Sequence, residues 1–229
     1  MAKIIKEGDI LYTKMDSKYQ LCKILRIDED TKTFHTLTYN PLDNLPKLNE
    51  IENLDVFIWH APIASFPKST TLTNIPVKEK ELSGYYEFLR HTDFKRFIDE
   101  TGEDLDAIIK NASQAYNEGN DLSSNDDYQE ALTKFTEAIN LFPLFYEALD
   151  NRGLTYMDLG QWDIAILDFK DSLGINPDSF LAVFSIGECY FRLKEFQKAL
   201  EYFKQALEIE PENSIGKEWL EKTEKNLND

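Results

Sequence analysis

Hydrophobic and polar residues alternate in two different ways along this chain of 229 residues. From residue 4 to about residue 76, short apolar segments are separated by polar turns, a pattern typical of β-strands. From residue 79 onward, apolar residues recur at the spacing of helices that bury one face. The sequence therefore predicts an α+β protein with a small antiparallel β domain in residues 1–78, connecting helices in 79–109 and an all-α domain in 110–229.

Five strands are expected in the β domain. Residues 10–14, 19–27 and 33–39 are separated by short polar turns and predict an antiparallel meander. A longer loop at 40–50 precedes the strongly apolar segment 56–64 and the short segment 70–75. A sheet of this size is usually closed into a barrel or covered by helices.

The C-terminal half repeats one pattern at a fixed interval, marked by Pro143, Pro177 and Pro211. Within each repeat, small residues allow two antiparallel helices to approach, a phenylalanine fills the space toward the neighbouring repeat, and the proline ends the second helix. The same register holds Gly119, Gly153 and Gly187; Ala131, Ala165 and Ala199; and Phe135, Phe169 and Phe203.

Residues 146–177, YEALDNRGLTYMDLGQWDIAILDFKDSLGINP, are similar to a tetratricopeptide repeat over nearly its full length. The segments 112–145 and 180–213 resemble the same family, and residues 213–228 have the apolar side that a capping helix needs to close the array. Arg152 is a departure, because apolar residues are commoner at its place. The resemblance implies a superhelix of three helix pairs plus one capping helix, seven helices in all.

The resemblance also implies that peptides bind in a groove lined by the first helix of each repeat. This groove is apolar in the middle and acidic at its borders, which favours an amphipathic, net basic peptide or protein surface. An alternative of equal weight is that the chain's own residues 82–100 fill the groove. The predicted groove residues are Tyr116, Asn117, Asn120, Glu147, Asp150, Asn151, Leu154, Met157, Asp158, Leu181, Phe184, Glu188, Phe191 and Arg192.

One known use of such a groove is a carboxylate clamp, in which asparagines and cations hold the terminal carboxylate of a chaperone tail. Asn120 and Asn151 match the asparagines of the clamp. Tyr116, Leu181 and Ser185 stand where two lysines and an arginine would be expected, so the neutralising charge is missing. Binding of acidic chaperone tails is therefore not the leading hypothesis, and the asparagines also have a structural interpretation as partners of neighbouring helices.

Charge narrows the choice of partners. The formal net charge is −17 and the isoelectric point is about 4.6. The charge is uneven, since residues 1–100 hold 14 basic and 16 acidic side chains and residues 101–229 hold 11 and 26. This acidity disfavours nucleic acid and anionic membranes as partners, and the sequence lacks an apolar run of about 20 residues for a membrane span. Two isolated cysteines give no disulfide framework, so we expect a cytoplasmic protein with protein or peptide partners.

The sequence offers no recognisable catalytic set. Its three histidines are scattered, neither cysteine has an activating neighbour, and the motifs of phosphate-binding loops and nucleophile elbows are absent. His60 lies in an apolar stretch, so we interpret it as a buried, hydrogen-bonded side chain. The acidic clusters at 28–30 and 125–127 lack a full calcium-loop pattern. We therefore expect no enzymatic activity, no cofactor and no metal.

Two classes of function follow. The first is an adaptor or scaffold that binds a partner in the groove. The second is a bacterial immunity protein that inhibits a toxin: residues 5–90 resemble small immunity proteins, and the acidic helical half suits a basic toxin. The opening residues 8–30 also resemble SH3-like or Tudor-like barrels, in which Tyr12, Tyr19 and Phe34 would either form an aromatic cage or simply pack.

Overall fold

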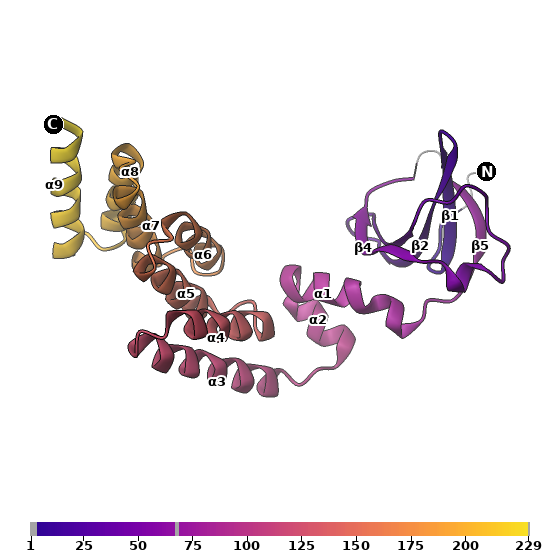
Figure 1. The fold of residues 1–229 in the computed structure, drawn as a ribbon, viewed down its shortest axis with the longest axis horizontal. Coiled ribbons are helices and arrows are strands. Elements are labelled where there is room, and N and C mark those ends of the chain that lie inside the picture. The colour runs from indigo at the N-terminus through magenta and orange to yellow at the C-terminus, as the bar shows by residue number, and fades with distance from the viewer. Residues whose placement is uncertain (1–3, 67–68, 229) are drawn as a thin grey trace. The chain divides into compact units, whose positions relative to one another are not determined.

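The computed structural model describes residues 4–66 and 69–228, and the chain divides into two compact units between Thr101 and Gly102 (Figure 1). The first unit contains the sheet and two helices, and the second is entirely helical. This α+β organisation is the one that the sequence predicts.

A five-stranded antiparallel sheet with the strand order β4-β3-β2-β1-β5 forms the first unit's framework. The first three strands make the expected meander, and β5 returns to pair with β1 at the far edge. Asp16 adopts a φ of 52° in the tight turn after β1, a conformation that aspartate tolerates better than most residues. The strands are β1 (Asp9–Met15), β2 (Lys18–Asp28), β3 (Thr33–Tyr39), β4 (Val56–Ile63) and β5 (Thr70–Asn74).

Both faces of the sheet are buried near its middle. Successive side chains of a regular strand point to opposite faces, yet Ile24 and Leu25 of β2 are both fully buried. A β-bulge between Ile24 and Arg26 adjusts the pairing with β3 at this point. Lys23, which is 2% exposed, donates its three N–H groups to Glu81 Oε1 (3.0 Å), Glu81 Oε2 (2.7 Å) and the Pro76 carbonyl (3.0 Å). A buried ammonium group needs such a complete set of partners.

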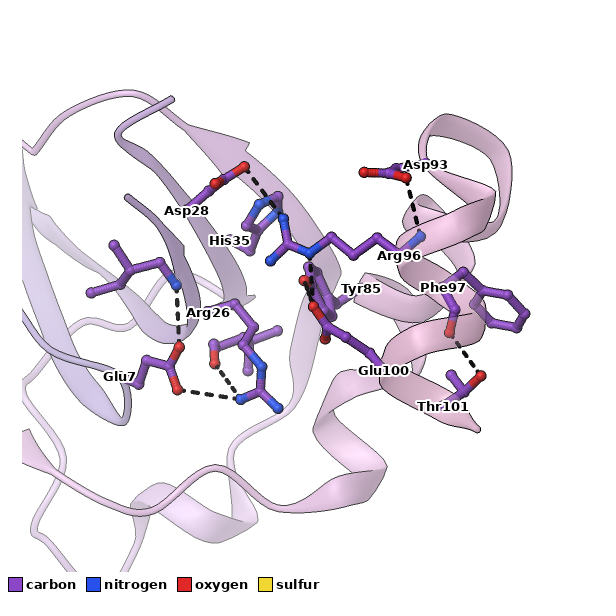
Figure 2. A network of polar contacts seen from close by, with 12 residues as sticks. Glu7, Arg26, Asp28, His35, Tyr85, Asp93, Arg96, Phe97, Glu100 and Thr101 are labelled. Carbon is purple, nitrogen blue, oxygen red and sulfur yellow. Dashed lines mark hydrogen bonds and ion pairs between the residues drawn. The ribbon is translucent and has the colours of Figure 1, made fainter. Parts of the chain in front are cut away.

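Two helices follow the sheet: α1 (Ser83–Thr92) packs against β4, and α2 (Phe94–Thr101) packs against α1. The short 3-10 helix η2 (Glu79–Leu82) precedes α1, and another, η1 (Ile51–Asn53), precedes β4. A Cβ atom at Gly84 would lie 3.0 Å from the Trp59 backbone, so α1 packs closely against β4. Arg96 of α2 pairs with Asp28 of β2 at 3.4 Å and with Glu100 at 2.7 Å (Figure 2). The helices expected to connect the two domains therefore belong to the first unit.

Seven helices form the described part of the second unit, in agreement with three helix pairs and a capping helix. The second helix of each pair ends two residues before the proline of its repeat. The helices are α3 (Leu105–Ser124), α4 (Tyr128–Leu141), α5 (Tyr146–Asp158), α6 (Trp162–Ile175), α7 (Phe180–Arg192), α8 (Phe196–Ile209) and α9 (Ser214–Asn228).

One contact explains the repeated glycine and phenylalanine. In the second repeat, the fully buried ring of Phe169 lies so close to Gly153 that an added Cβ would be 2.9 Å from its carbons. The equivalent distances at Gly119 and Gly187 are 2.7 and 2.8 Å. These approaches are shorter than ordinary van der Waals contacts, so each helix pair needs a residue without a side chain at this point.

Candidate functional site

The candidate site is the surface formed by α3, α5 and α7, which we call the first-helix wall. Helix α5 contacts both α3 and α7, so residues predicted from three separate repeats lie on neighbouring helices. Asn117, Asp158, Leu181 and Arg192 are exposed; Tyr116, Asn120, Glu147, Asn151, Leu154, Phe184, Glu188 and Phe191 are half-buried; and Asp150 and Met157 are buried.

A hydrogen-bonded group joins α3 to α5 on this wall. The Asn151 side-chain amide donates to the Tyr116 hydroxyl at 3.0 Å and to Asn120 Oδ1 at 2.7 Å. Both amide hydrogens of Asn151 are therefore occupied within the protein. This geometry agrees with the structural interpretation of the two asparagines, and Tyr116 stands in the place of the first expected cation.

The other two cation positions of a carboxylate clamp lie on α7. Leu181 is 44% exposed, whereas Ser185 is only 4% exposed. Neither side chain carries a charge. The described wall thus provides no cation at any of the three places where a clamp would hold a carboxylate.

Two predicted groove residues are buried, which corrects the sequence-based picture. Met157 belongs to the core cluster between the second and third repeats, together with Ala182 and Ile186. Asp150 is 6% exposed. Its pKa is raised by burial and by the charge of Glu147, which together outweigh the lowering effect of Ser172. Burial removes both side chains from the surface that a partner could reach.

Trp219 of the capping helix also belongs to this site, although it is not among the predicted groove residues. Its ring lies 6.1 Å from that of Phe184 and 5.2 Å from that of Phe191, both in edge-on geometry. The two phenylalanines are therefore partly covered by α9. The repeat register could have indicated this contact, because Trp219 lies as many residues after Ser185 as Ser185 lies after Asn151.

Charged side chains are distributed unevenly along the wall. Glu188 pairs with Arg192 at 3.2 Å, so part of the expected acidic border is neutralised. The Arg192 guanidinium also lies 5.9 Å from the ring centroid of Trp219, and Lys222 Nζ lies 4.2 Å from the same centroid. Glu147 and Asp158 have no ion-pair partner among the described residues.

Two of the three histidines of the first unit form a hydrogen-bonded pair, in which His35 is buried and His60 is half-buried. His35 Nδ1 and His60 Nε2 share a hydrogen bond of 2.8 Å beneath Tyr85 and Phe88 of α1. Burial lowers the pKa of His60 to about 4. His60 is thus hydrogen-bonded, as its apolar surroundings predict, but it is half-buried and not fully buried. Within residues 4–66 and 69–228, no group of three or more His, Cys, Asp or Glu side chains is placed to hold a metal ion.

The three aromatic residues considered for a cage separate into two contacts. The rings of Tyr12 and Tyr19 meet edge-on at 6.0 Å, whereas Phe34 packs against Phe66 at 5.4 Å. Phe34 also packs on a buried cluster that includes Leu11. These contacts follow the packing interpretation. In the described helices there is also no segment long and apolar enough to cross a bilayer.

Comparisons with known proteins concern the helical unit. Models of the tetratricopeptide repeat match residues 146–179 and 182–213. A segment of 57 residues is 40% identical to Hsp70-Hsp90 organizing protein 3 of Arabidopsis thaliana; it covers 25% of this chain and 10% of that protein. The present chain therefore spans only a tenth of this curated relative.

Solved structures share the fold of the same unit. The first repeat domain of Spaghetti (RPAP3), described as bound to the HSP90 peptide SRMEEVD, has a TM-score of 0.51 with 23% identity and covers 53% of this chain and 96% of that one. The repeat domain of Arabidopsis OM64 has a TM-score of 0.50 with 22% identity and covers 52% and 98%. The first repeat domain of human RPAP3 has a TM-score of 0.50 with 24% identity and covers 52% and 93%. The second and third repeats of this chain are tetratricopeptide repeats, and the helical unit as a whole shares the fold of tetratricopeptide repeat domains.

Proposed function

We propose that the first-helix wall binds a peptide or an extended segment of another protein, and that the chain acts as a non-catalytic adaptor. The supporting observation is the apolar surface that remains on the wall. Leu181 is 44% exposed and Leu154 is half-buried, although their neighbours in the repeats are packed into the core. Exposed apolar side chains that gather on one face commonly mark an interaction site.

The proposed partner is an amphipathic peptide with a net positive charge. Residues 101–229 contain 26 acidic and 11 basic side chains, and Glu147 and Asp158 bring part of this negative charge to the wall. Complementary charge steers association and selects among partners. The acidic peptide SRMEEVD bound by the Spaghetti domain would meet no cation at Tyr116, Leu181 or Ser185 in this chain.

The immunity-protein alternative has no comparable support. The matches reported above concern the helical unit, and their names describe chaperone-related proteins and not toxin inhibitors. We therefore retain the adaptor as the proposed function.

A peptide selection would test this proposal. Random peptides displayed on phage would be selected on the full-length protein, and the binders would then be synthesised and measured by fluorescence anisotropy. Leu181→Ser should weaken binding by about tenfold, because an apolar contact at the wall is lost. Leu167→Ser is the matched control, since Leu167 is 59% exposed but lies on α6.

Two results would contradict the proposal. One is a selection that yields no peptide, and the other is equal binding by the Leu181→Ser and Leu167→Ser variants. The peptide SRMEEVD should bind weakly to the same protein. Tight binding of this peptide would show that the argument from missing cations is wrong.

A further inference from the structure

The capping helix extends the first-helix wall by one helix. Trp219 occupies the place in α9 that Ser185 occupies in α7 and Asn151 in α5. Its ring contacts Phe184 and Phe191 from α7 and lies 5.7 Å from the ring of Phe203 in α8. Ile215, one turn earlier on α9, is 56% exposed. The wall therefore ends in an aromatic surface made by α7 and α9.

Two cations lie against this aromatic surface. Lys222 Nζ is 4.2 Å from the ring centroid of Trp219 and 5.0 Å from that of Phe191, and Arg192 approaches Trp219 at 5.9 Å. Cation–π contacts hold these side chains over the rings. A cation held in this way still has its hydrogen-bond donors, because an aromatic face does not accept as a carboxylate does.

Lys222 is available to an external partner. Its side chain is exposed, and among the described residues no carboxylate lies within ion-pair distance of its Nζ. Arg192 differs, because Glu188 already pairs with it at 3.2 Å. In a unit where acidic residues outnumber basic ones by more than two to one, an unpaired lysine fixed on an aromatic surface is a distinct local feature.

The opposite charge lies on the neighbouring repeat. Glu147 and Asp158 of α5 are without ion-pair partners in the described residues, and neither is buried. The unpaired charges thus differ between the two helices: Glu147 and Asp158 lie on α5 and Lys222 lies on α9, with Leu181 of α7 between. A peptide with opposite charges at its two ends would satisfy both regions in one orientation and repel both in the other.

We propose that the α7–α9 end of the wall, formed by Phe191, Trp219 and Lys222, binds an acidic side chain of the partner peptide and thereby fixes the direction in which the peptide lies. This inference rests on the proposed function and adds to it. The basic residues of the peptide lie over α5, its apolar residues contact Leu181, and one aspartate or glutamate pairs with Lys222.

The test uses the peptides selected on the full-length protein. We expect them to carry basic residues toward one end and an acidic residue toward the other. Lys222→Glu should weaken their binding by about tenfold, because an attractive pair becomes a repulsive one. Lys204→Glu makes the same charge change on the exposed surface of α8 and should leave binding within about twofold of the original. Circular dichroism would establish that both variants keep their helices.

A charge exchange makes the assignment specific. Replacing the acidic residue of the peptide by lysine should likewise weaken binding to the original protein by about tenfold and restore binding to the Lys222→Glu variant. Amidation of the peptide's C-terminus should have no effect, since the bound carboxylate belongs to a side chain.

The outcomes separate this inference from the proposed function. Selected peptides without an acidic residue, equal effects of Lys222→Glu and Lys204→Glu, or loss of binding on amidation alone would overturn the inference. If Leu181→Ser weakens binding in that case, the proposed function still stands. A selection without binders would contradict the proposed function itself.

Discussion

An ion pair inside the repeat domain gives the most demanding prediction for stability. Arg152 of α5 donates from Nε to Asp168 Oδ2 at 2.8 Å and from Nη2 to Asp168 Oδ1 at 2.7 Å. Its third nitrogen, Nη1, donates to Thr136 Oγ1 of α4 at 3.0 Å. Asp168 is 4% exposed. One guanidinium group thus links three helices, at the position where the repeat pattern favours an apolar residue.

Replacing one partner of this ion pair should destabilise the protein, whereas replacing both by apolar residues should not. Asp168→Ala leaves the guanidinium of Arg152 in a mostly buried place without its counter-charge, and breaking a buried pair in this way costs about 3–5 kcal/mol. The Arg152 side chain keeps 18% exposure, so we expect a loss of about 3 kcal/mol, at the lower end of that range. The double change Arg152→Met, Asp168→Leu should be close to neutral, because apolar replacements avoid the cost of burying both charges.

Urea unfolding followed by circular dichroism at the helical signal would measure these changes. Lys217→Ala serves as the control, because Lys217 pairs with Glu212 on the surface, where both side chains are about half or more exposed; it should change the free energy of unfolding by less than about 1 kcal/mol. The reasoning is refuted if Asp168→Ala costs no more than the control, or if the double variant is as unstable as the single one.

The remaining predictions concern packing, pH and thiol reactivity. Gly174→Ala on α6 should stabilise the protein by about 0.5–1 kcal/mol in thermal unfolding, because no atom lies within 4 Å of the added Cβ. Gly153→Ala should destabilise the protein, because its Cβ would meet a buried ring. Equal changes of the melting temperature in the two variants would contradict this contrast. Burial lowers the pKa of His60 to about 4 in the folded protein, whereas the pKa of an unfolded histidine is about 6.5. The first unit should therefore be fully stable above about pH 6.5 and lose stability as the pH falls toward 4. A urea midpoint, measured by tryptophan fluorescence, that does not change with pH would count against the packing of the His35–His60 pair. Burial raises the pKa of Cys22 and of Cys189 to about 12. Ellman's reagent should therefore react with both thiols only in denaturant. Rapid labelling of the native protein would show that the two thiols are not buried.

The repeat domain was predictable because its packing rule is local. The glycine that allows close approach, the phenylalanine that fills it and the proline that follows the second helix all recur once in each repeat. The close contact between Gly153 and the buried ring of Phe169 is the physical reason for that recurrence. The seven helices of the described second unit follow from it.

The candidate site was only partly predictable, because exposure depends on the neighbouring repeat. Met157 and Phe191 both lie late in the first helices of their repeats, but Met157 packs into the next repeat while Phe191 meets Trp219 of the capping helix. A helical face read from one repeat does not show which neighbour covers it. The repeat register, extended to α9, contains the missing information.

The first unit shows the same limit in a sheet. Alternation and turn residues predicted the strands, but the position of α1 and α2 depends on contacts between distant residues. Arg96 reaches Asp28 across 68 positions of sequence, and His35 pairs with His60 across 25. Nothing in the local pattern of either segment encodes such a pairing, so the helices were expected to serve as connectors.

The most direct test of the central claim is to ask which surface touches a bound peptide. A photoreactive benzoylphenylalanine would replace Leu181 in one protein and Leu167 in another, and each would be irradiated with a selected peptide and analysed by mass spectrometry. We expect a covalent adduct from position 181 on the first-helix wall and none from position 167 on α6. An adduct from position 167 alone would contradict it.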